Sequence, residues 1–563
     1  MKRKILVLFC VAVMTFTVLP MSGCRRNSGA QGTDSSKTQL YVGTLDQGVG
    51  KGWLELVADR FEEAFADYEL NGKKGVQVLV EGVDMATSLI NNFKRERVEV
   101  VFNEGVDYET WVNKKLLLDI TDAVSGKNAD LSAYGDPEGT TIESKMDESA
   151  AEYYKTDDNK YYAIPFYEGT NGIVFNVDLW EKYGFYFKDG GGWTGNVKEA
   201  TVGQDNRKGT FDDGLPRTFD DFFTLCEKIK STNSTKGGQP LIPIAWNGKY
   251  DLSYINSFLF CMAADVDGKE QYSLNFTFNG EAEGLITGFN GTTPIISQTK
   301  EPITDKDGYK LYKQQGKYYA LKFIETIIDN GYYSNKILNK STIDHKTMQA
   351  YFIKTEDDSR GAPLGQEIAM LIEGTWWFNE ANEYFSTNEQ YGGGKYEQRF
   401  GMMPLPKPTE DHVDGTHTLF NSKQAAAFIN ANIDKNKIEL AKEFLKFAHS
   451  NNSLIEFTET VSLLKPYDYT LDEEDNNLTY YAKQLLQVKE ASEKVYPFAD
   501  ARLFTRQKST LLSSTAWAVK IGDHSYNHPT IDFLGGVSAE DYFNGLLFAD
   551  KEYWQETFQN DFK

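Results

Sequence analysis

Short apolar runs alternate with helix-spaced apolar residues over the sequence between residues 39 and 111. The runs at 39–45, 76–80 and 98–102 have the length and composition of strands, and the segments between them carry apolar residues at helical spacing. Strands that alternate with helices in this way predict a parallel sheet with right-handed crossovers. Ligands bind to such sheets beyond the carboxyl ends of the strands. This pattern therefore predicts an α/β lobe with a site at one edge of its sheet.

The first 24 residues have the layout of a secretory signal. A basic start is followed by an apolar run from Ile5 to Met21, two small residues and Cys24. A retained membrane helix is the weaker alternative, because the run is short for a membrane span and no second run of such length follows. The end of the run, Met21-Ser22-Gly23-Cys24, resembles the bacterial lipobox, with methionine where leucine is usual. The resemblance implies that residues 1–23 are removed, and that lipid on Cys24 anchors the chain to the outer face of the cell membrane.

The segment 24–37 is expected to be a flexible tether, because it is polar and almost devoid of apolar side chains. More than 500 residues follow it, which exceeds the usual size of one core and favours at least two lobes. The formal net charge of −23 argues against nucleic acid as a partner, since nucleic acid requires basic patches. Acidity of this size suits a solvated surface outside the cell, and we expect a monomer.

Two cysteines remain after the signal and the lipobox are set aside. Cys226 shares a helical face with Phe222, Phe223 and Ile229, which favours a buried thiol that packs as a small hydrophobe. A disulfide between Cys226 and Cys261 is the alternative, and the sequence leaves it open.

Four parts of the sequence together resemble the extracellular solute-binding protein family 1, the carbohydrate-binding class that serves ATP-driven importers. These parts read YYAIPF (161–166) leading to GIVFNVDL (172–179), PRTFDDF (216–222), AMLIEGTWW (369–377) and ELAKEFLKF (439–447). They occur in the order of the family, behind a lipobox-like run. The chain departs from the family in length, with insertions at about 185–215 and 264–318 and a tail beyond residue 465.

The resemblance implies an α/β, two-lobed fold like that of periplasmic binding proteins. Each lobe would be a mostly parallel sheet flanked by helices, with a hinge between the lobes. The expected N-terminal lobe comprises 38–165 plus 373–433, and the expected C-terminal lobe comprises 166–372 plus 434–563. The implied partners are a carbohydrate ligand and the permease subunits of an ABC transporter.

Polar candidates for the ligand site follow strands or the first expected crossing between the lobes. Asp46, Glu104 and Asp107 come at strand ends of the first lobe, where helix capping or a solvated position is the alternative role. Glu168 and Asn171 follow the crossing at about residue 166, where a structural role in the hinge competes with ligand binding.

Aromatic candidates come from two further strand ends. Trp246 and Asn247 follow an apolar strand, and Trp376 and Trp377 follow Gly374 at an expected lobe crossing. A tryptophan ring can stack on the apolar face of a sugar, while amides and carboxylates bind its hydroxyls. Of the second pair we expect one ring in the site, preferably Trp376, and the other in the core. For Trp246 a core position is the alternative.

No metal site, cofactor or catalytic motif is expected. The sequence has no nucleophile elbow or phosphate-binding loop, and its histidine pairs lack the further ligands that a metal site needs. The main hypothesis, which the family resemblance implies, is a sugar receptor without enzymatic activity. A surface glycan-degrading enzyme and a receptor of the same fold for peptides or other small solutes remain as alternatives.

Overall fold

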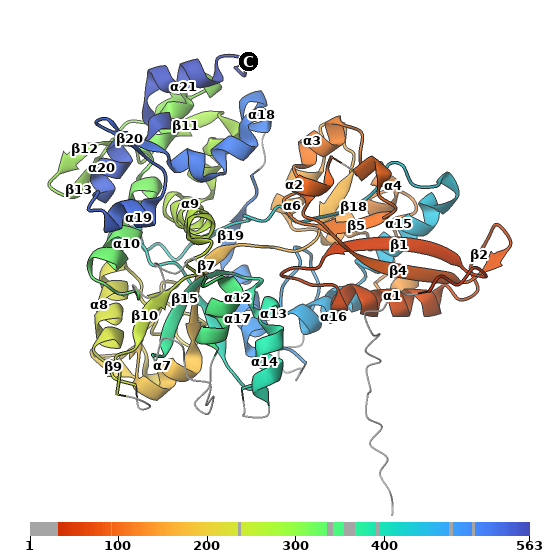
Figure 1. The fold of residues 1–563 in the computed structure, drawn as a ribbon, viewed down its shortest axis with the longest axis horizontal. Coiled ribbons are helices and arrows are strands. Elements are labelled where there is room, and N and C mark those ends of the chain that lie inside the picture. Colours follow the sequence, from red (N-terminus) through yellow and green to blue (C-terminus); the bar gives the residue numbers. More distant parts are fainter. Residues whose placement is uncertain are drawn as a thin grey trace, which may run out of the picture.

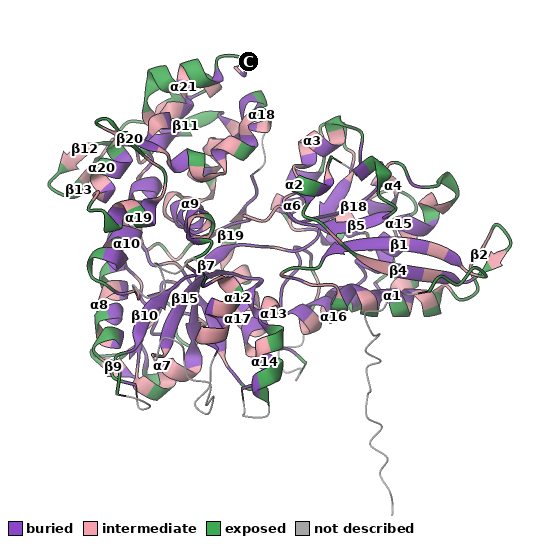
Figure 2. Ribbon diagram, in the orientation of Figure 1, coloured by how far each residue is buried: buried purple, intermediate pink, exposed green. Residues whose placement is uncertain are grey.

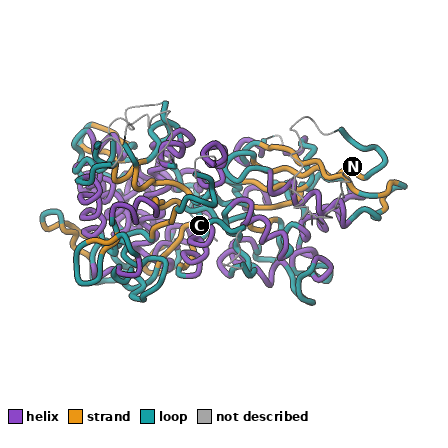
Figure 3. The backbone as a smooth tube through the Cα atoms, turned by 90° about the horizontal axis from the view of Figure 1, so that it is seen from below, coloured by secondary structure: helices purple, strands orange, loops and turns teal. Residues whose placement is uncertain are grey.

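The computed structural model describes residues 32–91, 93–234, 238–334, 342–353, 366–389, 393–471, 477–497 and 501–562. Its elements form two lobes that lie side by side along the long axis of the molecule (Figure 1). Each lobe contains strands covered by helices, as the view at right angles also shows (Figure 3). Cys24 and the expected signal segment lie outside the described residues. Within the described part, none of the helices has both the length and the apolar character needed to cross a membrane.

The first lobe is built on a five-stranded sheet in the order β4-β1-β5-β18-β6. Its strands are β1 (Thr38–Leu45), β4 (Val76–Val83), β5 (Val100–Asn103), β6 (Ala163–Pro165) and β18 (Ala426–Ile429). β1 pairs in parallel with β4 and with β5, as the alternating pattern predicts. Between β1 and β4, helix α1 (Gly52–Ala64) buries its apolar stripe. The first α/β lobe is thus confirmed.

The second lobe is built on a four-stranded sheet in the order β10-β15-β7-β16. Its strands are β7 (Asn171–Asn176), β10 (Ile242–Ala245), β15 (Ile368–Gly374) and β16 (Phe400–Met403). The helices of this lobe include α7 (Val177–Tyr183), α8 (Phe219–Lys230), α9 (Asp251–Thr277), α10 (Gln315–Asp329), α12 (His345–Phe352), α13 (Trp377–Glu380), α14 (Asn382–Asn388) and α17 (Tyr480–Glu490). A reciprocal capping box between Thr218 and Asp221 begins α8.

Each sheet is mostly parallel in strand direction, as expected, with one strand that runs against the others. β18 runs antiparallel to β5 and β6, and β7 runs antiparallel to β15 and β16. The physical reason lies in the chain path. β7 and β18 each follow a crossing, so they start at the junction between the lobes and run away from it, whereas β5, β6 and β15 end there.

Two parts of the chain lie in the lobe opposite to the one expected from the sequence. β16 pairs with β7 in the second lobe, although 373–433 was assigned to the first. Helices α15 (Ile438–Phe447) and α16 (Asn451–Val461) contact α1 of the first lobe, although 434–563 was assigned to the second. The chain therefore returns to the first lobe after β16 rather than near Glu373, and leaves it after α16 rather than near Ile433.

A C-terminal segment, residues 501–562, packs on the second lobe (Figure 1). It contains α18 (Arg502–Leu511), α19 (Pro529–Leu534), α20 (Ala539–Asn544) and α21 (Lys551–Phe558). α19 contacts α9 and α10, and α20 contacts α10, so the segment covers the helices rather than the sheet. Strand β19 (Ser492–Val495) leads into the segment and pairs in parallel with β17 (His417–Phe420).

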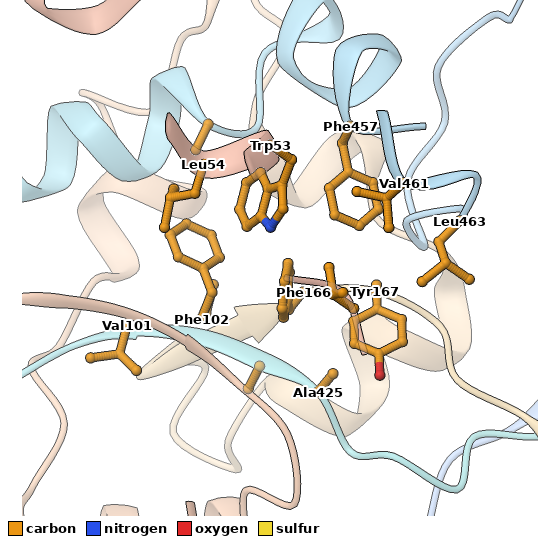
Figure 4. Packing of buried hydrophobic residues seen from close by; sticks show 14 of the residues in the cluster. Trp53, Leu54, Val101, Phe102, Phe166, Tyr167, Ala425, Phe457, Val461 and Leu463 are labelled. Carbon is orange, nitrogen blue, oxygen red and sulfur yellow. The ribbon is translucent and has the colours of Figure 1, made fainter. Parts of the chain in front are cut away.

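The buried residues of the sheets and their covering helices form two large hydrophobic clusters (Figure 2). In the first lobe, Trp53, Phe102, Phe166 and Phe457 pack around one point (Figure 4). Lys465 ends among these rings, with Nζ 4.7 Å from the centroid of Phe457 and 4.8 Å from that of Trp53. This Nζ has no hydrogen-bond partner among the described residues.

Cys226 and Cys261 are both buried, and neither forms a disulfide within the described part of the chain. The interpretation of Cys226 as a packed thiol is thereby confirmed.

Candidate ligand-binding site between the lobes

Strands of both sheets end at the junction between the lobes, and a loop from each side meets there. Asn379 of α13 in the second lobe donates its side-chain amide to the carbonyls of Gly48 and Val49, at 2.8 Å each. These two carbonyls belong to the loop that follows β1 in the first lobe. The loop is thus tied to the second lobe by two hydrogen bonds.

Four side chains converge beside this loop. Tyr167 Oη donates to Glu104 Oε1 at 2.7 Å, and Lys423 Nζ lies 3.4 Å from Glu104 Oε2. The same ammonium lies 3.6 Å from the centroid of the Trp376 ring, a cation–π contact. Glu104 follows β5 of the first lobe, Trp376 follows β15 of the second, and Tyr167 and Lys423 belong to crossing segments. The cluster is therefore assembled from both lobes.

A second polar group adjoins the first. Gln349 of α12 donates to Glu373 Oε1 at 3.1 Å and to Glu380 Oε2 at 2.8 Å. His345 Nε2 lies 3.3 Å from Glu380 Oε1. The carboxyl groups of Glu373 and Glu380 are thus held by the side-chain amide of Gln349, next to the end of β15.

The two carboxyl groups differ in charge behaviour. Burial, reinforced by the nearby Glu380, raises the pKa of Glu373 to about 8. Burial also opposes the charge of Glu380, but the hydrogen bond and charge of His345 outweigh it and hold its pKa below the usual range. Burial, followed by the charge of Glu373, raises the pKa of Tyr254. Near neutral pH, Tyr254 is therefore a hydrogen-bond donor and Glu380 an acceptor. The two oxygens of Glu373 accept from Gln349 and from the backbone N–H of Gly374.

Among the residues proposed from the sequence, Glu104 and Trp376 lie together in this cluster. Asp46 is exposed in the loop after β1, with its carboxylate beside Gly82. Asp107 is half-buried at the start of α3 (Tyr108–Asn113), and its Oδ1 has no hydrogen-bond partner among the described residues. Neither residue takes part in the hydrogen bonds and ion pairs of the cluster.

Glu168 and Asn171 take part in contacts that hold the crossing segments. Glu168 shares Lys494 with Asp147, with Lys494 Nζ 3.2 Å from Glu168 Oε1. Asn171, the first residue of β7, accepts a hydrogen bond from Ser422 Oγ at 3.1 Å. Both side chains therefore have partners that suit a structural role in the hinge.

Trp246, Asn247 and Trp377 lie in the core in this structure. Trp246 is 1 % exposed and donates its indole N–H to Asp251. Asn247 Oδ1 accepts from the backbone N–H of Tyr250 at 2.8 Å. Trp377 is fully buried among aromatic rings of α12, β16 and α17. Trp376 lies at the junction under Lys423 and is also buried, with 6 % of its surface exposed.

The sequence reasoning missed Tyr167, Lys423, Gln349 and Glu380. Tyr167 directly follows the YYAIPF segment, and this position at an expected lobe crossing could have marked it as a candidate site residue. Lys423 and Gln349 carry no such signal, because they reach the site only through the chain path and through the packing of α12 on β15. Within the described residues, no group of three or more His, Cys, Asp or Glu side chains could hold a metal ion.

Two α/β lobes with polar and aromatic side chains gathered where their strands end define a two-lobed ligand-binding protein. The chain belongs to the family of bacterial extracellular solute-binding proteins, whose family model matches residues 57–474. Membership confirms the resemblance seen in the sequence. It also places the protein outside the cytoplasm, since the proteins of this family bind solutes there.

Solved structures share the fold at low sequence identity. A chitin oligosaccharide binding protein aligns with a TM-score of 0.54 at 15% identity, over 93% of this chain and 99% of that one. A mannobiose complex of an ABC transporter binding protein from Bifidobacterium animalis subsp. lactis aligns with a TM-score of 0.51 at 13% identity, covering 93% and 95%. The protein RafE in complex with raffinose also gives 0.51 at 13% identity, covering 91% and 100%. Comparison with curated protein sequences finds no match.

Proposed function

We propose that this protein is a lipid-anchored receptor that captures a sugar or oligosaccharide between its lobes and delivers it to the permease of an ABC transporter. One observation carries the proposal: Glu104, Tyr167, Lys423 and Trp376 converge from both lobes at the strand ends. A ligand that touches all four contacts both lobes at once, so it favours the closed arrangement.

The chemistry of the cluster suits a sugar. A pyranose has an apolar face that packs on an aromatic ring and a rim of hydroxyls that both donate and accept hydrogen bonds. Trp376 supplies the ring, Glu104 and Glu380 supply acceptors, and Lys423 and Tyr167 supply donors. The solved relatives that are named for chitin oligosaccharide, mannobiose and raffinose support the same class of ligand.

Lys423 stands where the ligand would stack. Its ammonium covers one face of the Trp376 ring at 3.6 Å, and the ring edge packs against Gly374. We therefore expect Lys423 to leave the ring when a sugar binds and to donate to a sugar hydroxyl instead. Its carboxylate partner Glu104 would stay in place, held by Tyr167.

The experiment is a thermal-shift screen of the soluble chain that begins after Cys24. The panel comprises cello-, xylo-, manno- and chito-oligosaccharides of two to six units, raffinose, stachyose and a set of short peptides. A bound sugar is expected to raise the melting temperature by mass action, and calorimetric titration then gives its affinity. The sugar recovered afterwards should be unchanged, as a receptor requires.

Two outcomes would contradict the proposal. Stabilisation by a peptide, with no response to any sugar, would favour a peptide receptor of the same fold. Shortened sugar products after incubation would favour a glycan-degrading enzyme.

A further inference from the structure

A cavity of about 460 Å³ lies between the first turns of α9 and the C-terminal segment. α9 lines it with Tyr250 at its N-cap and with Ser253, Asn256 and Ser257. The opposite wall comes from residues 512–514 and His528. This second wall belongs to the part of the chain that exceeds the length expected for the family.

Polar groups on α9 point to a ligand that carries hydroxyl groups. Ser253, Asn256 and Ser257 are spaced three and four residues apart and so share one face of the helix. Asn256 is only 6 % exposed, yet its Oδ1 has no hydrogen-bond partner among the described residues. A buried acceptor without a donor is costly, and a ligand hydroxyl would satisfy it. The two serine hydroxyls can both donate and accept, as a polyhydroxy ligand needs.

Tyr250 gives the cavity an aromatic surface. It is 42 % exposed, and His345 lies against it with a distance of 5.7 Å between ring centroids. An exposed ring next to hydroxyls and an unsatisfied amide oxygen matches the two sides of a pyranose.

One contact links the cavity to the candidate site, and two others link its C-terminal wall to the first lobe. His345, which packs on Tyr250, also pairs with Glu380 at 3.3 Å. On the other wall, Leu512 follows α18, whose Lys508 reaches the first lobe. Lys508 Nζ lies 3.3 Å from Glu109 Oε2 and 3.1 Å from Tyr153 Oη. The C-terminal wall of the cavity thus stands beside the place where the lobes meet.

We propose that this cavity is a second carbohydrate subsite, in which Tyr250, Asn256 and the serines of α9 hold the far end of an oligosaccharide whose first units lie at Trp376. The inference rests on the proposed function and adds a preference to it: tighter binding of oligosaccharides of three or more units than of mono- or disaccharides. The C-terminal segment would then select for length.

The test compares affinities along the length series of whichever glycan binds in the screen, and it includes the monosaccharide alone, measured by saturation-transfer NMR. Tyr250→Ala is expected to lower the affinity for the four-unit ligand at least tenfold and to leave that for the two-unit ligand unchanged. Ser253→Ala/Ser257→Ala should act in the same direction without a buried substitution. Tyr396→Ala, at another exposed tyrosine, is the matched control and should change neither affinity.

The remaining variants separate the two proposals. Trp376→Ala is expected to weaken ligands of every length. The subsite would be overturned if Trp376→Ala lost binding while Tyr250→Ala and the serine double variant kept full affinity for ligands of every length. That result would leave the proposed receptor function intact. Monosaccharide binding that is lost only in Tyr250→Ala would support the cavity even where the junction binds nothing. If no glycan binds by either method, both proposals fail.

Discussion

Lys465 places an amine inside the aromatic cluster of the first lobe. It is fully buried, and burial, followed by the charge of Lys145, lowers the pKa of Lys465 to about 7. The four surrounding rings offer cation–π attraction, which recovers only part of the lost hydration. The buried Lys465 lowers the stability of the folded state, because its amine holds a proton more strongly in the unfolded chain than in the folded one.

The first prediction concerns this lysine. Lys465→Met should raise the free energy of unfolding by about 2–5 kcal/mol below pH 7, because it removes the cost of the buried charge. In the wild type, the unfolded state binds more protons than the folded state between pH 7 and about 10.5. The destabilisation caused by Lys465 therefore falls as the pH rises through that window. Urea unfolding at pH 6 and pH 9 should therefore show a smaller difference between variant and wild type at pH 9.

The exposed Lys435 provides the control for this experiment. Lys435→Met should change the free energy of unfolding by less than about 0.5 kcal/mol at both pH values. If Lys465→Met raised the free energy of unfolding equally at both pH values, the titration of the buried amine would not be the cause of the increase.

Trp376 at the junction and Trp246 in the core of the second lobe give the second prediction. Trp376→Ala should weaken sugar binding by about 2 kcal/mol or more, since it removes the stacking ring at the junction. Trp246→Ala should instead lower the free energy of unfolding by about 3–5 kcal/mol and leave the affinity of the folded protein unchanged, since its ring lies in the core. Calorimetric titration beside thermal melting measures both quantities, and the opposite pattern would exchange the two roles.

At the level of elements, β1, β4 and β5 of the first lobe could be predicted, whereas β18 and the lobe boundaries could not. β1, β4 and β5 stand out because buried parallel strands are runs of apolar residues separated by an amphipathic helix. Which lobe a strand joins depends on pairing between distant parts of the chain, and no local pattern encodes it. β16 shows this, because its partner β7 lies more than 200 residues earlier.

The residues of the candidate site also divide into those that the sequence pattern could predict and those that it could not. Glu104 and Trp376 could be proposed because each directly follows a recognisable strand, and strand ends face the junction. Lys423 and Gln349 could not, because their positions depend on how a crossing segment and α12 pack in three dimensions. Trp246 follows a strand as Trp376 does, yet its indole turns into the core and bonds Asp251. A position after a strand thus predicts that a residue lies near the junction, but it does not predict which way the side chain points.

On the scale of the whole molecule, the third prediction is that sugar binding closes the lobes. Glu104 and Trp376 come from different lobes, so a ligand bound to both gains contacts only when the lobes approach. Small-angle scattering should show a smaller radius of gyration in the presence of a saturating sugar from the screen. The Trp376→Ala variant at the same sugar concentration serves as the control and should keep the larger radius. An unchanged radius in the saturated wild type would contradict hinge closure.

The late entry of β18 and β16 has a consequence for the order in which the chain folds. β18 lies between β5 and β6, so the first sheet stays split until residue 426 is available, and the second sheet lacks an edge until residue 400. Neither lobe can complete its sheet from the first half of the chain. Contacts this distant in sequence slow folding, because a long loop must close before they form. The sheets of both lobes can therefore be completed only after residue 400 has become available for pairing.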